Sequence, residues 1–180
     1  WKNNFSEVFK QGGFDVVIGN PPYVRQELLG TQKNYFLKKY KVYHGVADLY
    51  SYFFERGIEL LNEKGLFGII VANKWMRANY GEPLRIWLKK QNIKQLIDFG
   101  DLQVFHGATT YPCIFICGKE KVEKYFEAVN VKTLQFESLG NYVVKNKILV
   151  VQNSLEDNGW NLTSNVEQKL LKKINDNGIA

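Results

Sequence analysis

The tetrapeptide Asn20-Pro21-Pro22-Tyr23 places two rigid prolines between an amide and an aromatic ring. Proline fixes φ at about −65° and has no N–H group, so the carbonyl oxygen of Pro21 finds no donor within the pair. This carbonyl and the side-chain oxygen of Asn20 can both accept hydrogen bonds from an NH₂ group. Such bonds favour an sp³-like nitrogen, whose lone pair can attack an electrophile. The four residues therefore predict a pocket for a planar group that carries an amine, with the Tyr23 ring beside it.

The tetrapeptide follows an apolar run, residues 14–18, that stops at Gly19. A short continuous apolar run is typical of a parallel strand that is buried on both faces. In open α/β sheets ligands bind beyond the carboxyl ends of the strands, so the tetrapeptide lies where chemistry is expected. The alternative is a Pro-Pro turn that only ends the strand, with Tyr23 covering the core.

The apolar pattern after the tetrapeptide alternates between helices and strands. Helices are predicted at residues 33–40, at 48–65 and from Pro83 onward, and strands at residues 66–72, 93–99 and 112–117. The order strand, helix, strand, helix, strand indicates a parallel α/β sheet with right-handed crossovers. Because no helix separates the last two of these strands, we expect the strand at 112–117 to pair antiparallel.

Local signals suggest where these elements begin and end. Asp48 is predicted as the N-cap of the second helix and Gly65 as its C-cap. Residues 126–134 and 142–151 are weaker strand candidates. Ser164 and Glu167 have the spacing of a capping box and predict a last helix.

The composition is that of a globular domain with a modest basic charge. A net charge of +6 over 180 residues is compatible with a polyanionic partner but does not require one. No apolar run approaches the roughly 18 residues of a membrane span. Cys113 and Cys117 would lie about 13 Å apart on one strand, too far to form a disulfide. We expect free thiols in a reducing cytoplasm, and no Cys or His cluster suggests a metal site.

Four segments extend the pattern around the tetrapeptide: FDVVIGNPPYVR, ADLYSYFFERGIELL, GLFGIIVANKWM and LRIWLKKQNIKQLIDFGDLQVFHGATTYPCIFIC. Together they resemble the N6-adenine DNA methyltransferases that use S-adenosylmethionine, in particular the methyltransferase region of type IIG restriction-modification enzymes. The resemblance implies the C-terminal half of a Rossmann-like α/β methyltransferase domain, with a mostly parallel sheet and an antiparallel strand at the hairpin. It divides the chain into a catalytic half, residues 1–140, and a connecting segment, residues 141–180, that leads toward a target recognition domain.

The resemblance also implies roles for the tetrapeptide and for one later aromatic residue. Asn20 and Pro21 would hold the N6 amino group, Pro22 would complete the catalytic loop, and Tyr23 would stack on the target adenine. The partner would be double-stranded DNA, and the adenine must first leave the duplex because its N6 is committed to base pairing. Phe105 matches the aromatic residue that faces the flipped base from the far side. Its alternative role is that of a loop phenylalanine packed into the core.

A pocket for S-adenosylmethionine is implied as well. Asn20, Leu49 and Phe53 match residues that line it, although the last two could equally form the apolar face of a helix. Arg25 is the candidate for a contact to a DNA phosphate. The family's glycine-rich turn, which cradles the methionine part of the cofactor, is not found among the 19 residues before Asn20. We therefore expect an incomplete cofactor pocket, and an inactive fragment, in these 180 residues.

Two other functions remain open at this point. Methyltransferases that act on glutamine side chains of proteins, or on an exocyclic amine of RNA, carry the same tetrapeptide. A non-catalytic interaction or DNA-binding module that retains the fold is the second alternative, and the absence of a glycine-rich turn is its best support. The segments ADLYSYF and VFHGATTYPCIF favour a DNA methyltransferase.

Overall fold

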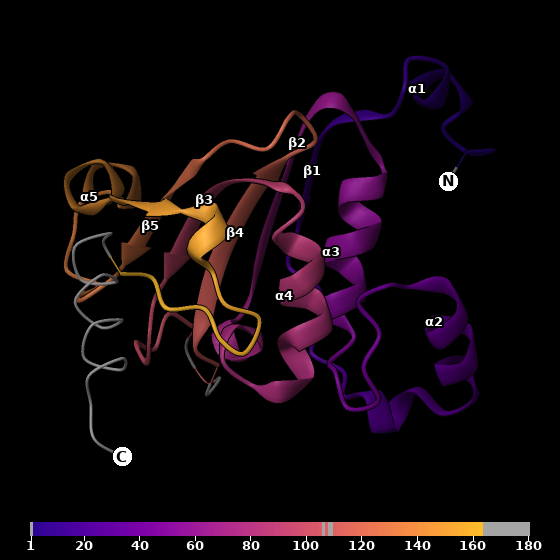
Figure 1. Cartoon of the computed structure of the whole chain (residues 1–180), viewed down its shortest axis with the longest axis horizontal. Coiled ribbons are helices and arrows are strands. Elements are labelled where there is room, and N and C mark those ends of the chain that lie inside the picture. Colours follow the sequence, from indigo (N-terminus) through magenta and orange to yellow (C-terminus); the bar gives the residue numbers. More distant parts are fainter. Residues whose placement is uncertain (1, 106, 108–109, 164–180) are drawn as a thin grey trace.

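The computed structural model describes residues 2–105, 107 and 110–163, and its centre is a six-stranded sheet (Figure 1). Four strands, β1, β2, β3 and β5, run in one direction, and β4 and β6 run in the other. The predicted α/β fold, with a mostly parallel sheet and an antiparallel strand after the third, is confirmed. In spatial order the strands are β1 (Phe14–Gly19), β2 (Leu61–Ala72), β4 (Pro112–Gly118), β3 (Asn92–Asp98), β5 (Tyr125–Asn130) and β6 (Ile148–Val151).

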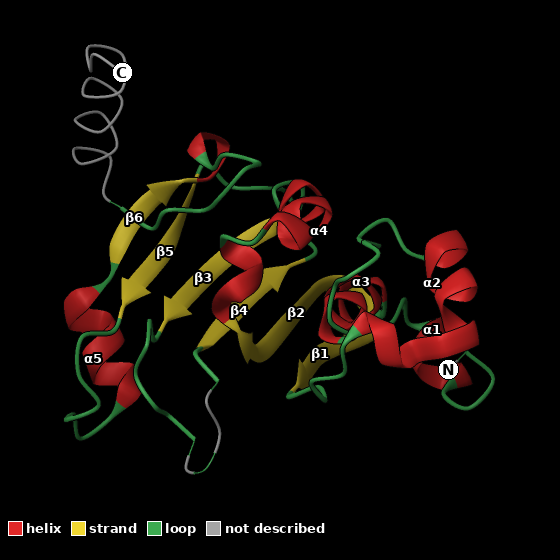
Figure 2. Ribbon diagram, turned by 90° about the horizontal axis from the view of Figure 1, so that it is seen from below, coloured by secondary structure: helices red, strands yellow, loops and turns green. Residues whose placement is uncertain are grey.

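The main helices are α1 (Ser6–Lys10), α2 (Lys33–Lys39), α3 (Tyr50–Glu59), α4 (Glu82–Leu88) and α5 (Leu139–Asn146). Helices α3 and α4 pack on one face of this sheet and α5 packs on the other (Figure 2). Short 3₁₀ helices are η1 (Gln26–Gln32), η2 (Asn73–Met76), η3 (Asn79–Gly81) and η4 (Gln152–Ser154). The larger apolar core lies beneath α3 and α4, and a smaller cluster that includes Ile97, Val129 and Val143 lies beneath α5. Neighbouring residues of β3, Leu96 and Ile97, join different clusters because successive side chains of a strand point to opposite faces.

Strand β1 differs from its prediction because it lies at the edge of the sheet. It pairs with β2 alone among the described strands, and Val16 and Ile18 are 58% and 81% exposed. The prediction of a strand buried on both faces is therefore wrong for this strand. An apolar run indicates that a strand avoids water, but it does not show which other segments cover it.

The junction between α3 and β2 is also tighter than predicted. The helix ends at Glu59, and β2 begins at Leu61, so Gly65 lies within the strand and is not a C-cap. The partner of Leu61 on β1 is Phe14, while the partner of Leu66 is Val16, which leaves extra residues on the β2 side. A Cβ on Gly65 would come within 2.7 Å of the Phe14 carbonyl oxygen. The glycine is required by the close approach of β1, not by the end of a helix.

Two further boundary predictions fail for identifiable reasons. Asp48 does not cap α3: the N-cap position is Leu49, and the Asp48 backbone instead forms an isolated antiparallel bridge with Arg25. Residues 142–151 are not one strand, because the Ser138 hydroxyl accepts a hydrogen bond from the Asn141 N–H at 3.2 Å and starts α5. Only Ile148–Val151 is extended. The helix predicted from Ser164 lies outside the described residues.

The segment after β6 returns to the core beside the turn that follows β2. Trp160 is fully buried, its ring centroid lies 5.2 Å from that of Trp75, and its backbone N–H donates to the Met76 carbonyl at 2.8 Å. Residues up to Leu162 therefore help to hold this turn in place.

Gly57 lies on the buried face of α3, where the helix crosses β2. A Cβ there would come within 2.2 Å of the Phe67 ring, which is itself buried. Gly57→Ala should therefore destabilise the fold by about 1–3 kcal/mol, although alanine is the better helix former. Urea unfolding of the two proteins measures this difference.

Gly140→Ala in α5 is the matched control. The nearest atom to its added carbon, Ser138 Oγ, is 3.6 Å away, which is an ordinary contact. This variant should be neutral or more stable by up to about 1 kcal/mol. Equal stability of Gly57→Ala and the wild type would contradict the close packing of α3 on β2.

Candidate active site

The Asn20-Pro21-Pro22-Tyr23 loop lies at the carboxyl end of β1, as predicted. Strands β1 and β2 are parallel, with Gly19 paired to Ile69, so their carboxyl ends lie side by side. The loop therefore lies next to Asn73, which directly follows β2, and we call this side of the sheet its carboxyl edge. Asn20 and Pro22 are exposed, and Pro21 is buried. The loop therefore presents the Asn20 amide to solvent on a backbone anchored from within.

The Tyr23 side chain packs partly against the protein and is partly exposed to solvent. Its ring packs edge-on against Tyr50, with centroids 5.9 Å apart, and the residue remains 42% exposed. Partial burial raises the pKa of Tyr23, and so does the nearby Cys113, while the backbone N–H of Ala72 acts in the opposite direction. The phenol is therefore neutral at physiological pH, and one part of its ring remains available for a ligand.

The chain after Tyr23 is fastened to the start of α3. The Leu49 N–H donates to the Val24 carbonyl at 2.7 Å, next to the backbone bridge between Arg25 and Asp48. Burial raises the pKa of Asp48, although the positive charges of Arg25 and Lys74 partly oppose this. The bridge and the Leu49 hydrogen bond bring the predicted residues Arg25 and Leu49 together directly after the Asn20-Pro21-Pro22-Tyr23 loop.

A buried tyrosine supports the loop from below. Tyr50 is fully buried, and its hydroxyl lies 3.3 Å from that of Tyr80. Burial is the main cause that raises the pKa of Tyr50 far above its ordinary value. Tyr50 thus connects the Tyr23 ring to the turn before α4.

The structure places the remaining predicted residues around this edge. Leu49 is half-buried and packs against the main core, whereas Phe53, one turn into α3, is 41% exposed. Phe105 is half-buried in the connection between β3 and β4, which leaves the same edge. The ring contact found for Tyr23 among the described residues is with Tyr50 and not with Phe105.

Sequence reasoning missed a buried polar network next to the loop. Asp98, the last residue of β3, accepts hydrogen bonds from the Asn73 amide at 2.7 Å and from the Gly100 N–H at 2.9 Å. Its other carboxylate oxygen is 3.1 Å from the Arg77 guanidinium. The available signal was a polar residue at the carboxyl end of each of two predicted buried strands, Asn73 after one and Asp98 in the other.

Arg85 holds the turn between β2 and α4 from inside the protein. It is fully buried and donates to the carbonyl oxygens of Trp75 at 2.6 Å, Ala78 at 2.8 Å and Asp157 at 2.8 Å. Burial lowers the pKa of Arg85, and Glu82 and Asp157 partly offset this. A single guanidinium thus joins two carbonyls of the turn to the carbonyl of Asp157, which lies in the segment after β6.

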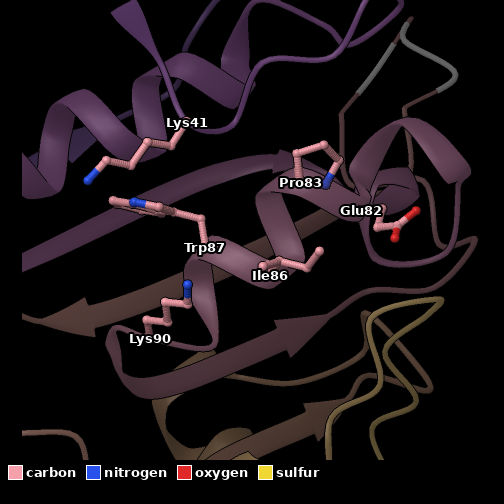
Figure 3. A pocket seen from close by; sticks show the side chains of 6 residues that line it. All are labelled: Lys41, Glu82, Pro83, Ile86, Trp87 and Lys90. Atoms are coloured by element: carbon pink, nitrogen blue, oxygen red, sulfur yellow. The ribbon is translucent and has the colours of Figure 1, made fainter.

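A shallow hollow of about 360 Å³ lies elsewhere, between α4 and the chain that follows α2 (Figure 3). None of the predicted site residues lines it. Its lining consists of Lys41, Glu82, Pro83, Ile86, Trp87 and Lys90.

The described part of the chain has neither a candidate metal cluster nor a candidate membrane-spanning helix. No group of three or more His, Cys, Asp or Glu side chains there could hold a metal ion. None of the helices it contains is both long and apolar enough to cross a membrane.

Comparisons with known proteins point to one family. The family model described as Eco57I restriction-modification methylase matches residues 1–105. The type II methyltransferase M.BstVI of Geobacillus stearothermophilus is 33% identical over 145 residues, which cover 75% of this chain and 25% of that protein. The chain therefore spans about a quarter of the length of this relative.

Solved structures share the fold at lower identity. A type IIL restriction-modification enzyme, MmeI in complex with DNA, superposes with a TM-score of 0.59 at 18% identity, over 77% of this chain and 19% of that one. A Listeria monocytogenes protein assigned to the class I S-adenosylmethionine-dependent methyltransferases gives a TM-score of 0.57 at 18% identity, over 74% and 41% of the two chains. The Rossmann-like methyltransferase fold implied by the sequence is confirmed.

Arg85→Met tests the support of the turn next to the site. The substitution keeps most of the side-chain volume but removes the donors to three carbonyl oxygens. We expect a loss of about 3 kcal/mol in unfolding free energy, roughly 1 kcal/mol for each hydrogen bond.

The control is Arg56→Met, which removes a half-exposed guanidinium paired with Glu59 at 3.2 Å. An exposed pair of this kind contributes about 0.2–1 kcal/mol, so this variant should stay close to the wild type in urea unfolding. Equal effects of the two substitutions would contradict a supporting role for Arg85.

Proposed function

The chain belongs to the Eco57I restriction-modification methylase family, and on that premise we propose that it is the catalytic part of an enzyme that methylates the N6 amino group of adenine in DNA. The observation that carries this proposal is the Asn20-Pro21-Pro22-Tyr23 loop at the carboxyl edge of β1, where the Asn20 amide faces solvent and Pro21 is buried. A turn that only ended a strand would not need an exposed amide held on such a rigid support.

In this proposal the loop binds and polarises the substrate amine. The Asn20 side-chain oxygen and the Pro21 carbonyl accept hydrogen bonds from the two N–H groups of N6, which favours a pyramidal nitrogen. S-adenosylmethionine, when bound, supplies an electrophilic methyl group. The nitrogen lone pair points away from the two acceptors, and the surplus proton leaves N6 after the methyl transfer. No general base is needed before the attack.

Tyr23 and Phe105 would hold the extruded base. The Tyr23 ring is half-exposed and braced from behind by Tyr50, so it offers one rigid face for stacking. Its neutral phenol adds no charge beside the adenine. Phe105 lies in the β3–β4 connection at the same edge of the sheet and would cover the opposite face of the base.

The residues of α3 fit one wall of a cofactor pocket. Phe53 keeps 41% of its surface exposed on a helix whose other residues are largely buried, and Leu49 lies one turn before it. An aromatic ring and an aliphatic side chain suit the adenine ring of S-adenosylmethionine, and Asn20, directly after β1, would line the same pocket. The family's glycine-rich turn is not found among the 19 residues before Asn20. We therefore expect the isolated fragment to be inactive.

Double-stranded DNA is the proposed substrate. The net charge of +6 suits a polyanion, and Arg25 is exposed two residues after Tyr23, where it would contact a phosphate. DNA is also the partner in the MmeI structure that shares this fold. We place the catalytic half at residues 1–140 and a connection toward a target recognition domain at residues 141–180, whose first part packs on the sheet through β6 and Trp160.

A cytoplasmic location accompanies this proposal. Cys113 and Cys117 are both free and buried on β4, and burial raises the pKa of each thiol well above its ordinary value. Free thiols are typical of a reducing compartment, where host DNA is methylated.

Asn20→Ala and Tyr23→Ala test the proposed site in the full-length protein. Loss of the Asn20 acceptor should lower kcat about 100-fold or more, by analogy with loss of one transition-state hydrogen bond. Loss of the Tyr23 ring should weaken use of DNA by roughly 5–150-fold, as for one stacked base. The measurement is transfer of labelled methyl groups from S-adenosylmethionine to duplex DNA, followed by nucleoside analysis for N6-methyladenine.

Tyr125→Ala is the matched control. Tyr125 is 39% exposed and is the first residue of β5, so it lies at the amino ends of the parallel strands, away from the carboxyl ends that carry the loop. It should retain full activity. Unchanged methylation in both site variants would refute the site, and a methylated glutamine, RNA or cytosine product would refute the substrate. Binding of DNA without any methyl transfer by the wild type would favour the non-catalytic module.

A further inference from the structure

The carboxylate of Asp98 is buried and held in one orientation at the end of β3. Its side chain is 3% exposed. One oxygen accepts hydrogen bonds from the Asn73 amide and the Gly100 N–H, and the same Asn73 amide also donates to the Gly100 carbonyl at 3.0 Å. The remaining oxygen is free to face one further partner, and that partner is Arg77.

Arg77 joins this buried acid to the surface. Its Nη2 atom lies 3.1 Å from Asp98, while 55% of its side chain is exposed. Within the part of the chain that the structure describes, no other hydrogen bond or ion pair engages the Arg77 side chain. A guanidinium carries five N–H donors, and Asp98 accepts from one of them. The remaining donors of this exposed side chain are available to a ligand, while the ion pair holds the guanidinium in place.

The backbone on both sides of Arg77 is also fixed. Arg85 donates to the carbonyls of Trp75 and Ala78, which flank Arg77 in sequence. The Arg77 N–H donates to the Lys74 carbonyl at 3.0 Å. The buried Asp98 carboxylate needs one positive partner, and a single N–H of Arg77 provides it. This need does not account for the exposure of the rest of the guanidinium.

The position of Arg77 relates it to the catalytic loop. The turn that carries it follows β2 directly, and the N–H of Ala72, the last residue of β2, lies by the Tyr23 hydroxyl. The next N–H, that of Asn73, donates to the Tyr111 carbonyl at 2.8 Å. The turn is therefore tied on one side to Tyr23 and on the other to the connection that carries Phe105.

We propose that Arg77, oriented by Asp98, binds a backbone phosphate of the DNA strand that carries the target base. This inference rests on the proposed function, because it takes DNA as the substrate. A planar guanidinium with two free parallel N–H groups matches two phosphate oxygens, which a lysine cannot do. The buried Asp98 lies behind Arg77 and acts as a positioning residue, since it touches Arg77 and not the DNA.

Binding of the full-length protein to a fluorescent random-sequence duplex, measured over a range of salt concentrations, tests the contact. A phosphate contact contributes about 0.9 to the slope of log K against log salt. Arg77→Gln should lower the slope by about this amount and weaken binding on every sequence alike. Arg77→Lys should restore the wild-type salt slope but not the full affinity for the duplex. Lysine keeps the positive charge but lacks the two parallel N–H groups that bind two phosphate oxygens.

Arg56→Gln is the matched control, since Arg56 is also paired with a carboxylate but lies in the last turn of α3, away from the catalytic loop. It should leave slope and affinity unchanged. An Arg77→Gln slope equal to that of the wild type overturns the proposal, and so does an equal drop in both variants.

Asp98→Asn tests whether Asp98 affects DNA binding by orienting Arg77 or only by stabilising the fold. It should reduce affinity and raise KM for DNA in the Arg77 wild-type background, but add no further loss of affinity in the Arg77→Gln background. A loss that is the same in both backgrounds overturns the positioning role. If Asp98→Asn lowers the unfolding temperature strongly, the comparison of Arg77→Gln with Arg77→Lys alone decides the proposal.

The outcomes also distinguish this inference from the proposed function. Methyl transfer to DNA by the wild type with an unchanged Arg77→Gln slope would leave the function standing and remove the phosphate contact. A reduced slope without any methyl transfer would leave the contact standing and remove the catalytic function.

Discussion

The parallel pairing of β1 with β2 determines where every candidate functional group lies. It brings the carboxyl ends of these two strands to one edge, with the Asn20-Pro21-Pro22-Tyr23 loop on one and Asn73 on the other. Strand β3 runs in the same direction and brings Asp98 to that edge as well. The two prolines then keep the first loop from collapsing onto its neighbours, because neither can donate a backbone hydrogen bond.

Irregular turns at this edge require partners for their carbonyl groups, and buried side chains provide them. Arg85 satisfies the turn between β2 and α4, while Asn73 and Asp98 satisfy the start of the connection after β3. Unpaired polar groups in these positions would be costly. The same carboxylate that stabilises the turn after β3 also orients Arg77, because its second oxygen accepts a hydrogen bond from the guanidinium.

The exposed edge of β1 bears on the cofactor as well as on the fold. Val16 and Ile18 present apolar surface on a strand that has a neighbour on one side only among the described strands, an arrangement that isolated domains generally avoid. This exposed apolar surface is consistent with the incomplete cofactor pocket that we propose for these 180 residues. In the proposal, Leu49 and Phe53 on α3 would form the wall of that pocket that belongs to this chain.

The sequence by itself determined the order of the elements, the antiparallel strand β4 and the loop at the end of β1, because apolar periodicity and proline geometry are local properties. It also identified Asn20 and Tyr23 as the chemical groups to examine, and their catalytic roles remain predictions. Only the tertiary structure decided that Gly65 is required because β1 approaches it closely, and that the backbones of Asp48 and Arg25 form an isolated bridge. It also decided that residues 139–146 form a helix. It alone revealed the contact between Arg77 and Asp98, which are separated by 21 residues. Such contacts depend on which strands become neighbours, and sequence periodicity does not contain that information.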